Sequence, residues 1–191
     1  SSFNTKDERF RFSKEKKRII RTLDLLVIDE ISMVRADLLD QIDAVLRLHK
    51  DKNRPFGGVQ LLMIGDLSQL APVVKESDWT MLREYYRTPY FFGSLALQQT
   101  QHVTIELQHV YRQTDTNFIN ILNEVRENRL TPGGLAMLNS RYCDESVIKK
   151  CGDGVIRLTT HNATVNSYNE QRMNELKGAR YAFDATVTGT F

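Results

Sequence analysis

The sequence predicts an α/β fold in which a parallel sheet is flanked by helices. Two short and nearly continuous apolar runs, LDLLVI at 23–28 and VQLLMI at 59–64, are typical of strands that are covered on both faces. Between them, apolar residues recur at helical spacing over 38–46. Strand, helix and strand in this order form a βαβ unit, for which we expect a right-handed crossover.

The helix between the two runs has one apolar and one polar side. The turn RPFGG at 54–58 then leads into the second strand. The apolar side carries Leu38, Leu39, Ile42, Val45 and Leu46, and the polar side carries Asp40, Gln41, Asp43 and Arg47.

The rest of the chain alternates between further short elements. Strands are predicted at 102–107 and 155–160, and helices at 118–128 and 135–142, with a break at 130–134 and a loop at 143–154. The strand at 155–160 leads into a helix that carries Val165, Tyr168, Met173 and Leu176. An alternating stretch closes the chain at 181–189.

Composition narrows the functional class. The 191 residues are 41% hydrophobic and 26% charged with a net charge of +2, as in ordinary globular proteins, and the longest apolar runs are far too short to span a membrane. We therefore expect a cytoplasmic protein.

Cys143 and Cys151 match no zinc motif and are interpreted as ordinary thiols. KEKKRIIR at 14–21 has five positive side chains, which fit a solvated helix face or a contact with phosphates.

An acid pair follows the first apolar run. Ligands of open α/β sheets bind beyond the carboxyl ends of the strands, where Asp29 and Glu30 are expected. Asp29 can hold Mg²⁺ through a bound water, and Glu30 can orient and deprotonate an attacking water. The alternative is a surface turn with two solvated acids.

A second polar signature, GDLSQLAPV at 65–73, follows the second apolar run and is expected to face the same crevice. Gly65 permits a close backbone approach or a positive φ, and Asp66 adds a carboxylate at the crevice and is a candidate for binding the nucleotide. Gln69 offers an amide that can donate to a γ-phosphate oxygen and accept from water.

A third signature is ELQHVYRQTD at 106–115. Arg112 in this segment can neutralise the charge that develops on a γ-phosphate during transfer. An arginine between a strand and a helix is, by itself, also typical of a surface ion pair.

Together and in this order, the three signatures resemble the ATP-dependent DNA helicases of the RecD and Pif type in superfamily one. LLVIDEISM is similar to the family's Walker B segment, GDLSQLAPV to its glutamine motif and YRQTDTNFINILNEVREN to its arginine motif. RLTTHNATVNSYNEQRM resembles the start of a second motor domain.

The resemblance implies a RecA-like P-loop NTPase motor, incomplete at both ends, that uses ATP and Mg²⁺. Residues 1–108 would belong to the first motor domain, and 109–191 would hold the arginine motif and the start of the second. Asp29 would serve Mg²⁺, Glu30 the hydrolytic water, Gln69 the γ-phosphate and Arg112 the transition state. Thr160, His161 and Asn162 would lie near single-stranded DNA, and duplex junctions, repair and recombination are implied as well.

The chain also departs from the family pattern. Ala71 stands where the family commonly has proline, and none of the ten glycines is followed by lysine, so no GKS or GKT phosphate loop is present. We therefore expect an internal piece of a longer helicase that is inactive by itself. The edges of such an incomplete sheet would be open to non-native pairing with another chain, and the oligomeric state is left open.

Two other classes remain as alternatives. One is a degenerate, non-catalytic module that only binds DNA or protein, and it predicts a gene that encodes little more than these residues. The other is a P-loop ATPase of another kind, such as a loader or a signalling switch, whose hydrolysis would be indifferent to DNA.

Overall fold

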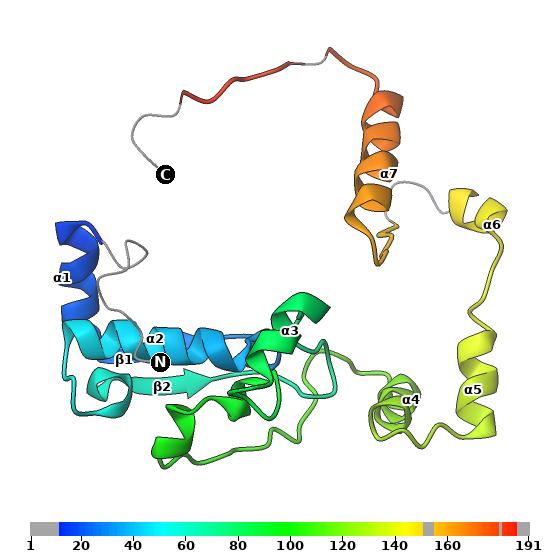
Figure 1. Cartoon of the computed structure of the whole chain (residues 1–191). Helices are drawn as coiled ribbons and strands as arrows, with labels where there is room; N and C mark the ends of the chain where they lie inside the picture. The colour runs from blue at the N-terminus through cyan, green and yellow to red at the C-terminus, as the bar shows by residue number, and fades with distance from the viewer. Residues whose placement is uncertain (1–11, 151–154, 180, 187–191) are drawn as a thin grey trace. The chain divides into compact units, whose positions relative to one another are not determined.

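A computed structural model describes residues 12–150, 155–179 and 181–186 of the chain. The chain divides into two compact units, with the boundary between Arg129 and Leu130, and each unit is described by itself (Figure 1). This division concerns compactness within the chain. The motor-domain boundary expected at 108/109 stays a prediction.

The first unit contains the predicted βαβ arrangement. Strands β1 (Leu25–Ile28) and β2 (Gln60–Met63) pair in parallel, with Leu25 opposite Gln60 and Ile28 opposite Met63. Helix α2 (Ala36–His49) connects them and lies along the sheet in Figure 1. The two apolar runs and the helical spacing between them therefore correspond to the elements that the sequence predicts.

The strands are covered on one face only, so the expectation of burial on both faces is wrong for the described chain. Leu26, Ile28, Leu61 and Met63 pack against the core. On the other face, Val27 is 50% exposed and Leu62 is 47% exposed. An apolar run predicts a strand but cannot show which distant element covers each face.

The core forms where α2 meets the sheet, the PFGG turn and the segment before residue 100. Its buried members are Leu39, Leu46, Phe56, Val59, Ala96 and Leu97. The turn itself is the short helix η3 (Pro55–Gly58), in which Gly57 has a φ of 61°. A Cβ on Gly57 would lie 2.7 Å from the carbonyl oxygen of Leu46, so this turn can approach α2 only with glycine.

Two acids of the predicted polar side of α2 are structural. Asp43 is 8% exposed, pairs with Arg47 at 2.7 Å and accepts a hydrogen bond from the Phe56 amide. Asp40 accepts from the hydroxyls of Tyr86 and Ser94 and from two amides that follow Ser94. Burial and the Asp40 contact raise the pKa of Tyr86. The polar side of α2 therefore anchors the segment 86–96 rather than facing solvent throughout.

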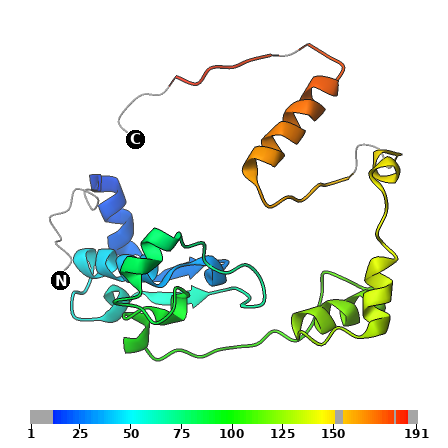
Figure 2. The ribbon, with the colours of Figure 1, turned by 45° about the vertical axis from the view of Figure 1, so that its right-hand side comes forward.

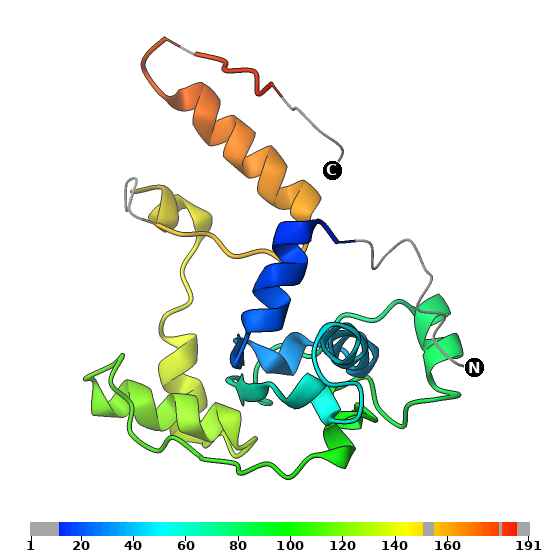
Figure 3. The same ribbon diagram turned by 90° about the vertical axis from the view of Figure 1, so that its left-hand side faces the viewer.

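Two further helices flank the sheet region. Helix α1 (Lys14–Thr22) begins at Ser13, whose hydroxyl accepts a hydrogen bond from the Lys16 amide. It packs against α2, which Figure 3 shows nearly end-on while α1 runs upright beside it. Helix α3 (Glu76–Leu82) follows β2 and the GDLSQLAPV loop (Figure 2). The short helices η2 (Ile31–Met33), η4 (Phe91–Gly93) and η5 (Leu97–Gln99) complete this region.

The strand predicted at 102–107 does not form. Val103, Ile105 and Leu107 are each at least 80% exposed, and the segment has no regular structure. The alternation is present, but a strand needs a neighbour to pair with, and the described chain supplies none here. Helix α4 (Thr116–Arg126) follows, begins at the Asp115 cap and confirms the helix predicted near 118–128.

The second unit consists of helices. It contains α5 (Pro132–Asn139), α6 (Glu145–Lys150) and α7 (Asn162–Glu175). The loop predicted at 143–154 is wrong for 145–150, which are helical, and the strand predicted at 155–160 is irregular. Residues 181–186 form no strand, and the remainder of the alternating stretch lies outside the described residues. Cys143 is a free, exposed thiol, whereas Cys151 is not among the described residues.

Among the described helices, none combines the length and the apolar character needed to cross a membrane. The described sheet has two strands, so each strand has an outer edge without a partner in the described residues. Pairing of those edges with another chain stays a prediction.

Candidate functional site

The parallel register brings the two polar signatures to the same edge of the sheet. The Ile64 amide donates to the Ile28 carbonyl at 2.9 Å, and the Ile31 amide donates to the Ile64 carbonyl at 2.9 Å. The backbone ladder thus continues past the named strands into both signatures. DEISM and GDLSQL therefore leave the sheet side by side, as the sequence predicts for a ligand site at the carboxyl ends of the strands.

The acid pair Asp29 and Glu30 is exposed at this edge. The Glu30 amide donates to the Asp29 carboxylate at 2.8 Å, which holds that side chain beside the strand end. Glu30 has φ 51° and ψ 41°, a left-handed conformation that costs a residue with a Cβ about 1 kcal/mol or more. This turn starts the short helix η2 (Ile31–Met33).

Gly65 allows the two signatures to touch. A Cβ at this position would lie 2.9 Å from the Ile31 side chain and 3.0 Å from the Ile31 amide nitrogen. Its φ is not positive, so close approach is the reason for glycine here. Ser32 beside it is 1% exposed, and its hydroxyl has no hydrogen-bond partner within the described chain.

Asp66 connects three groups on the second signature. One of its oxygens accepts from the Ser68 amide at 2.9 Å, and the other accepts from the Gln69 side-chain amide at 3.1 Å and from Arg126 at 2.8 Å. Burial raises the pKa of Asp66. The hydrogen bonds from Ser68 and Gln69 and the charge of Arg126 lower this pKa by more than burial raises it, so the pKa lies below its usual value. Asp66 is therefore ionised at neutral pH and restrains Gln69.

Arg112 contacts none of these groups within the described chain. It is exposed in an irregular segment, and no contact within the described chain joins it to Asp29, Glu30 or Gln69. The arginine that reaches the edge is Arg126 at the end of α4, whose side chain is 52% exposed. Sequence reasoning missed Arg126 although it lies inside the segment that resembles the arginine motif, because the resemblance gives the role to Arg112 and helical spacing alone does not distinguish Arg126 from a surface residue.

The donor set fits Mg²⁺ only in combination with a nucleotide. No group of three or more acidic, histidine or cysteine side chains within the described residues could hold a metal ion by itself. Mg²⁺ usually binds through one or two carboxylates, several waters and the phosphates of its substrate. The exposed Asp29 meets that requirement, whereas the oxygens of Asp66 already accept three hydrogen bonds.

The residues predicted to lie near single-stranded DNA are in the second unit. Thr160 and His161 are joined by a hydrogen bond of 2.8 Å between the hydroxyl and Nδ1, and Asn162 begins α7. All three are exposed. Nearby, the Arg157 guanidinium stacks on the Tyr168 ring at 4.3 Å.

Comparison with known proteins identifies the family. A family model described as PIF1-like helicase matches residues 5–132, about two thirds of the chain. The chain belongs to the PIF1-like helicase family. The human ATP-dependent DNA helicase PIF1 is 41% identical over 164 residues, which are 84% of this chain and 23% of the human protein. The chain therefore spans about a quarter of the length of the curated PIF1 relatives that it matches.

Solved structures of Pif1 helicases have the same fold. A Bacteroides Pif1 in complex with ADP-AlF3 and single-stranded DNA matches with a TM-score of 0.72 and 35% identity, covering 88% of this chain and 39% of the other. A second Pif1 structure concerns DNA unwinding at forked duplex DNA by two coordinating Pif1 helicases. It matches with a TM-score of 0.75 and 38% identity, covering 85% of this chain and 38% of the other. The chain thus has the RecA-like fold of superfamily-one helicases, and it corresponds to a part of such a helicase.

Proposed function

We propose that the chain is part of an ATP-dependent DNA helicase that couples ATP hydrolysis to translocation on single-stranded DNA and to unwinding of the duplex. The observation that carries this proposal is the shared sheet edge. Two exposed acids at the end of β1 lie beside a glutamine motif at the end of β2, and Gly65 allows their backbones to touch. The family membership supports the same function.

Each residue at the edge has a distinct role in this proposal. Asp29 holds Mg²⁺ through a water, and Glu30 orients the attacking water and accepts its proton. Gln69 contacts the γ-phosphate with the amide hydrogen that Asp66 leaves free. Arg112 stabilises the charge of the transition state. When bound, Mg²⁺ would neutralise part of the negative charge of the phosphates.

Asp66 contributes to nucleotide binding through Gln69 rather than through the nucleotide directly. Its carboxylate already accepts from Ser68, Gln69 and Arg126, and its low pKa keeps it ionised to accept these bonds. Holding one Gln69 amide hydrogen fixes the direction of the other. This arrangement reduces the entropy that Gln69 loses when a γ-phosphate binds.

The proposed partners are single-stranded DNA and duplex junctions, with Thr160, His161 and Asn162 near the single strand. One of the matched Pif1 structures is a complex with single-stranded DNA, and another concerns DNA unwinding at forked duplex DNA by two Pif1 helicases. Roles in DNA repair and recombination, use of Mg²⁺ and a cytoplasmic setting are narrower parts of the same proposal.

The 191-residue chain by itself should have negligible affinity for ATP. No phosphate loop with lysine occurs in its sequence, so Asp29 and Glu30 would face a triphosphate without a compensating cation from that loop. Titration calorimetry of the chain with MgATP measures this directly. Binding in the micromolar range would contradict the assigned arrangement.

The proposal is tested in the full-length protein that carries this chain. We expect ATPase activity that single-stranded DNA stimulates, together with ATP-dependent displacement of a strand from a forked duplex. ATPase activity that is indifferent to DNA would favour a P-loop ATPase of another class. DNA binding without any ATPase activity would favour a non-catalytic module.

A further inference from the structure

Helix α1 carries a row of cations that the nucleotide site does not use. Its members recur at the spacing i, i+3, i+4 and i+7, which places them on one face of the helix. We call this row the basic stripe, and it consists of Lys14, Lys17, Arg18 and Arg21. The stripe is about 10.5 Å long, because α-helical residues rise by about 1.5 Å each.

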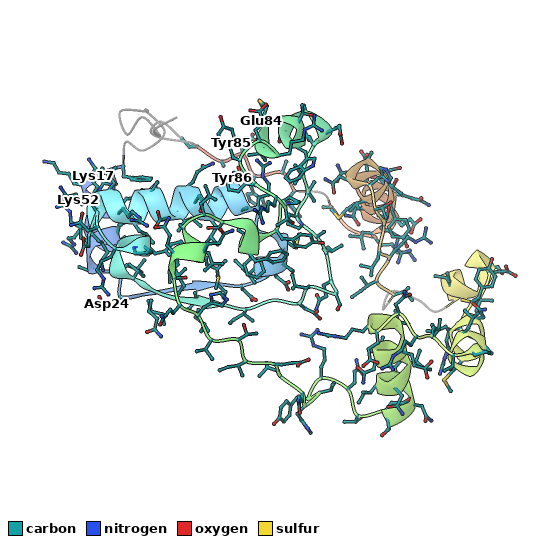
Figure 4. All side chains as sticks on the ribbon, turned by 60° about the horizontal axis from the view of Figure 1, so that its bottom comes forward. Lys17, Asp24, Lys52, Glu84, Tyr85 and Tyr86 are labelled. Carbon is teal, nitrogen blue, oxygen red and sulfur yellow. The ribbon has the colours of Figure 1, made fainter. Side chains whose placement is uncertain are left out.

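The rest of the first unit fixes where the stripe lies. Ile20 and Leu23 pack against the hydrophobic core, so α1 is held by its apolar side. Burial lowers the pKa of His49 at the end of α2, and the charges of Lys17 and Arg21 lower it further, which shows that the stripe passes close to this ring. Figure 4 shows Lys17 at the same end of α2 as Lys52, away from Tyr86.

Within the described chain, no carboxylate neutralises the stripe. Among the described residues, none of its four side chains forms an ion pair or hydrogen bond, and Glu15 on the same helix pairs with none of them. Like charges at i, i+4 destabilise an isolated helix by a few tenths of a kcal/mol per pair. A row of unpaired cations on a packed helix is thus complementary to an external polyanion.

The chemistry of the stripe fits the backbone of a duplex. One strand of B-DNA advances about 3.4 Å per phosphate along the axis, so the stripe spans about three phosphates. A rigid helix offers its charges at fixed spacing, as a duplex does. Surfaces for single strands combine cations with aromatic side chains that stack on bases, and α1 contains no aromatic residue.

We propose that the basic stripe is a contact surface for the phosphate backbone of duplex DNA. This inference rests on the proposed helicase function and adds a duplex-binding surface to it. Arg21 precedes β1, whereas Asp29 and Glu30 follow that strand. The Arg21 end of the stripe is therefore separate from the nucleotide edge, and the contact reads no base sequence.

The test measures binding of the 191-residue chain to a short labelled duplex by fluorescence anisotropy over a range of salt concentrations. The stripe variant replaces all four members by glutamine. The matched control removes four exposed positive charges elsewhere in the first unit by the substitutions Lys16→Gln, Lys75→Gln, Arg83→Gln and Arg87→Gln. Both variants lose the same net charge, and glutamine has a helix propensity close to that of lysine and arginine.

We expect the stripe variant to lose both affinity and salt dependence. If two of its cations contact phosphates, the slope of log K against log salt falls by about 1.8, and binding at about 0.1 M salt weakens roughly 60-fold. The control should stay close to the wild type. Circular dichroism checks the fold, and the smaller variant Lys14→Glu with Arg18→Glu serves as a second test at two exposed positions.

Several results would overturn the inference. These are a stripe variant that binds like the control, a wild-type chain without measurable duplex binding, and an equal loss for single strands and duplex. Stripe-dependent binding to anionic vesicles without binding to duplex would also contradict it. The ATPase of the full-length stripe variant at saturating single-stranded DNA should remain unchanged, so this inference and the proposed function fail separately.

Discussion

Replacing Asp40 by alanine should unfold the first unit at a markedly lower temperature. Asp40 is the acceptor for the hydroxyls of Tyr86 and Ser94 and for the amides of Leu95 and Ala96. Ser94 is fully buried, and Tyr86 and Ala96 are at most 7% exposed. The substitution therefore leaves three buried donors without an acceptor.

The magnitude follows from those three donors. A buried donor without an acceptor costs about 1–3 kcal/mol, so the free energy of unfolding should fall by about 3 kcal/mol or more. For a chain of this size that corresponds to a decrease in Tm of roughly 6–12 °C. Thermal and urea unfolding followed by circular dichroism measure both quantities.

The control is the same substitution at an exposed acid. The Asp24 side chain is fully exposed and lies 3.8 Å from Lys50. Asp24→Ala should leave the unfolding midpoint unchanged. A loss of less than about 1 kcal/mol in Asp40→Ala would refute the reasoning, since it would mean that water replaces the carboxylate without cost.

Three other predictions concern the edge and its surroundings. Gly65→Ala should lower the free energy of unfolding by about 1–3 kcal/mol, because its Cβ meets the Ile31 backbone; an unchanged urea midpoint would contradict this contact. Arg126→Gln should lower the free energy of unfolding by less than about 1 kcal/mol, since the Arg126 side chain that pairs with Asp66 is half exposed. In a protein that already carries Asp66→Asn, the same substitution should leave the free energy of unfolding unchanged. Additive effects of the two substitutions would exclude an interaction between them. Because the pKa of His49 is lowered in the folded state, the histidine of the unfolded state binds a proton at a higher pH, and the free energy of unfolding should fall as the pH drops below about 6.5. His49→Gln should make the free energy of unfolding depend less steeply on pH in this range. An equal pH dependence in both proteins would exclude His49 as its source.

The local pattern of the sequence predicts the elements that the first unit shares with its relatives. The apolar runs at 23–28 and 59–64 and the helical spacing between them correspond to β1, β2 and α2. The convergence of the two signatures follows from parallel pairing alone. These features depend on periodicity within short segments, which a single sequence contains.

Features that depend on distant partners could not be predicted. The helical pattern places Asp43 on the polar side of α2, whereas in the structure it is buried and accepts a hydrogen bond from the Phe56 amide thirteen residues away. Arg126 contacts Asp66 across sixty residues. Val103 and Ile105 alternate as in a strand, yet no neighbouring strand pairs with them in the described chain. Alternation indicates what a segment can form, and only its neighbours decide whether it does.

The role of the sheet edge is tested most directly by Glu30→Gln in the full-length protein. The substitution removes the carboxylate that would accept a proton from water, while it keeps the size of the side chain and its left-handed backbone. We expect ATP to bind with nearly wild-type affinity and DNA-stimulated hydrolysis to fall by at least about 100-fold. Hydrolysis at the wild-type rate in this variant would contradict the assignment of the edge as the hydrolytic site.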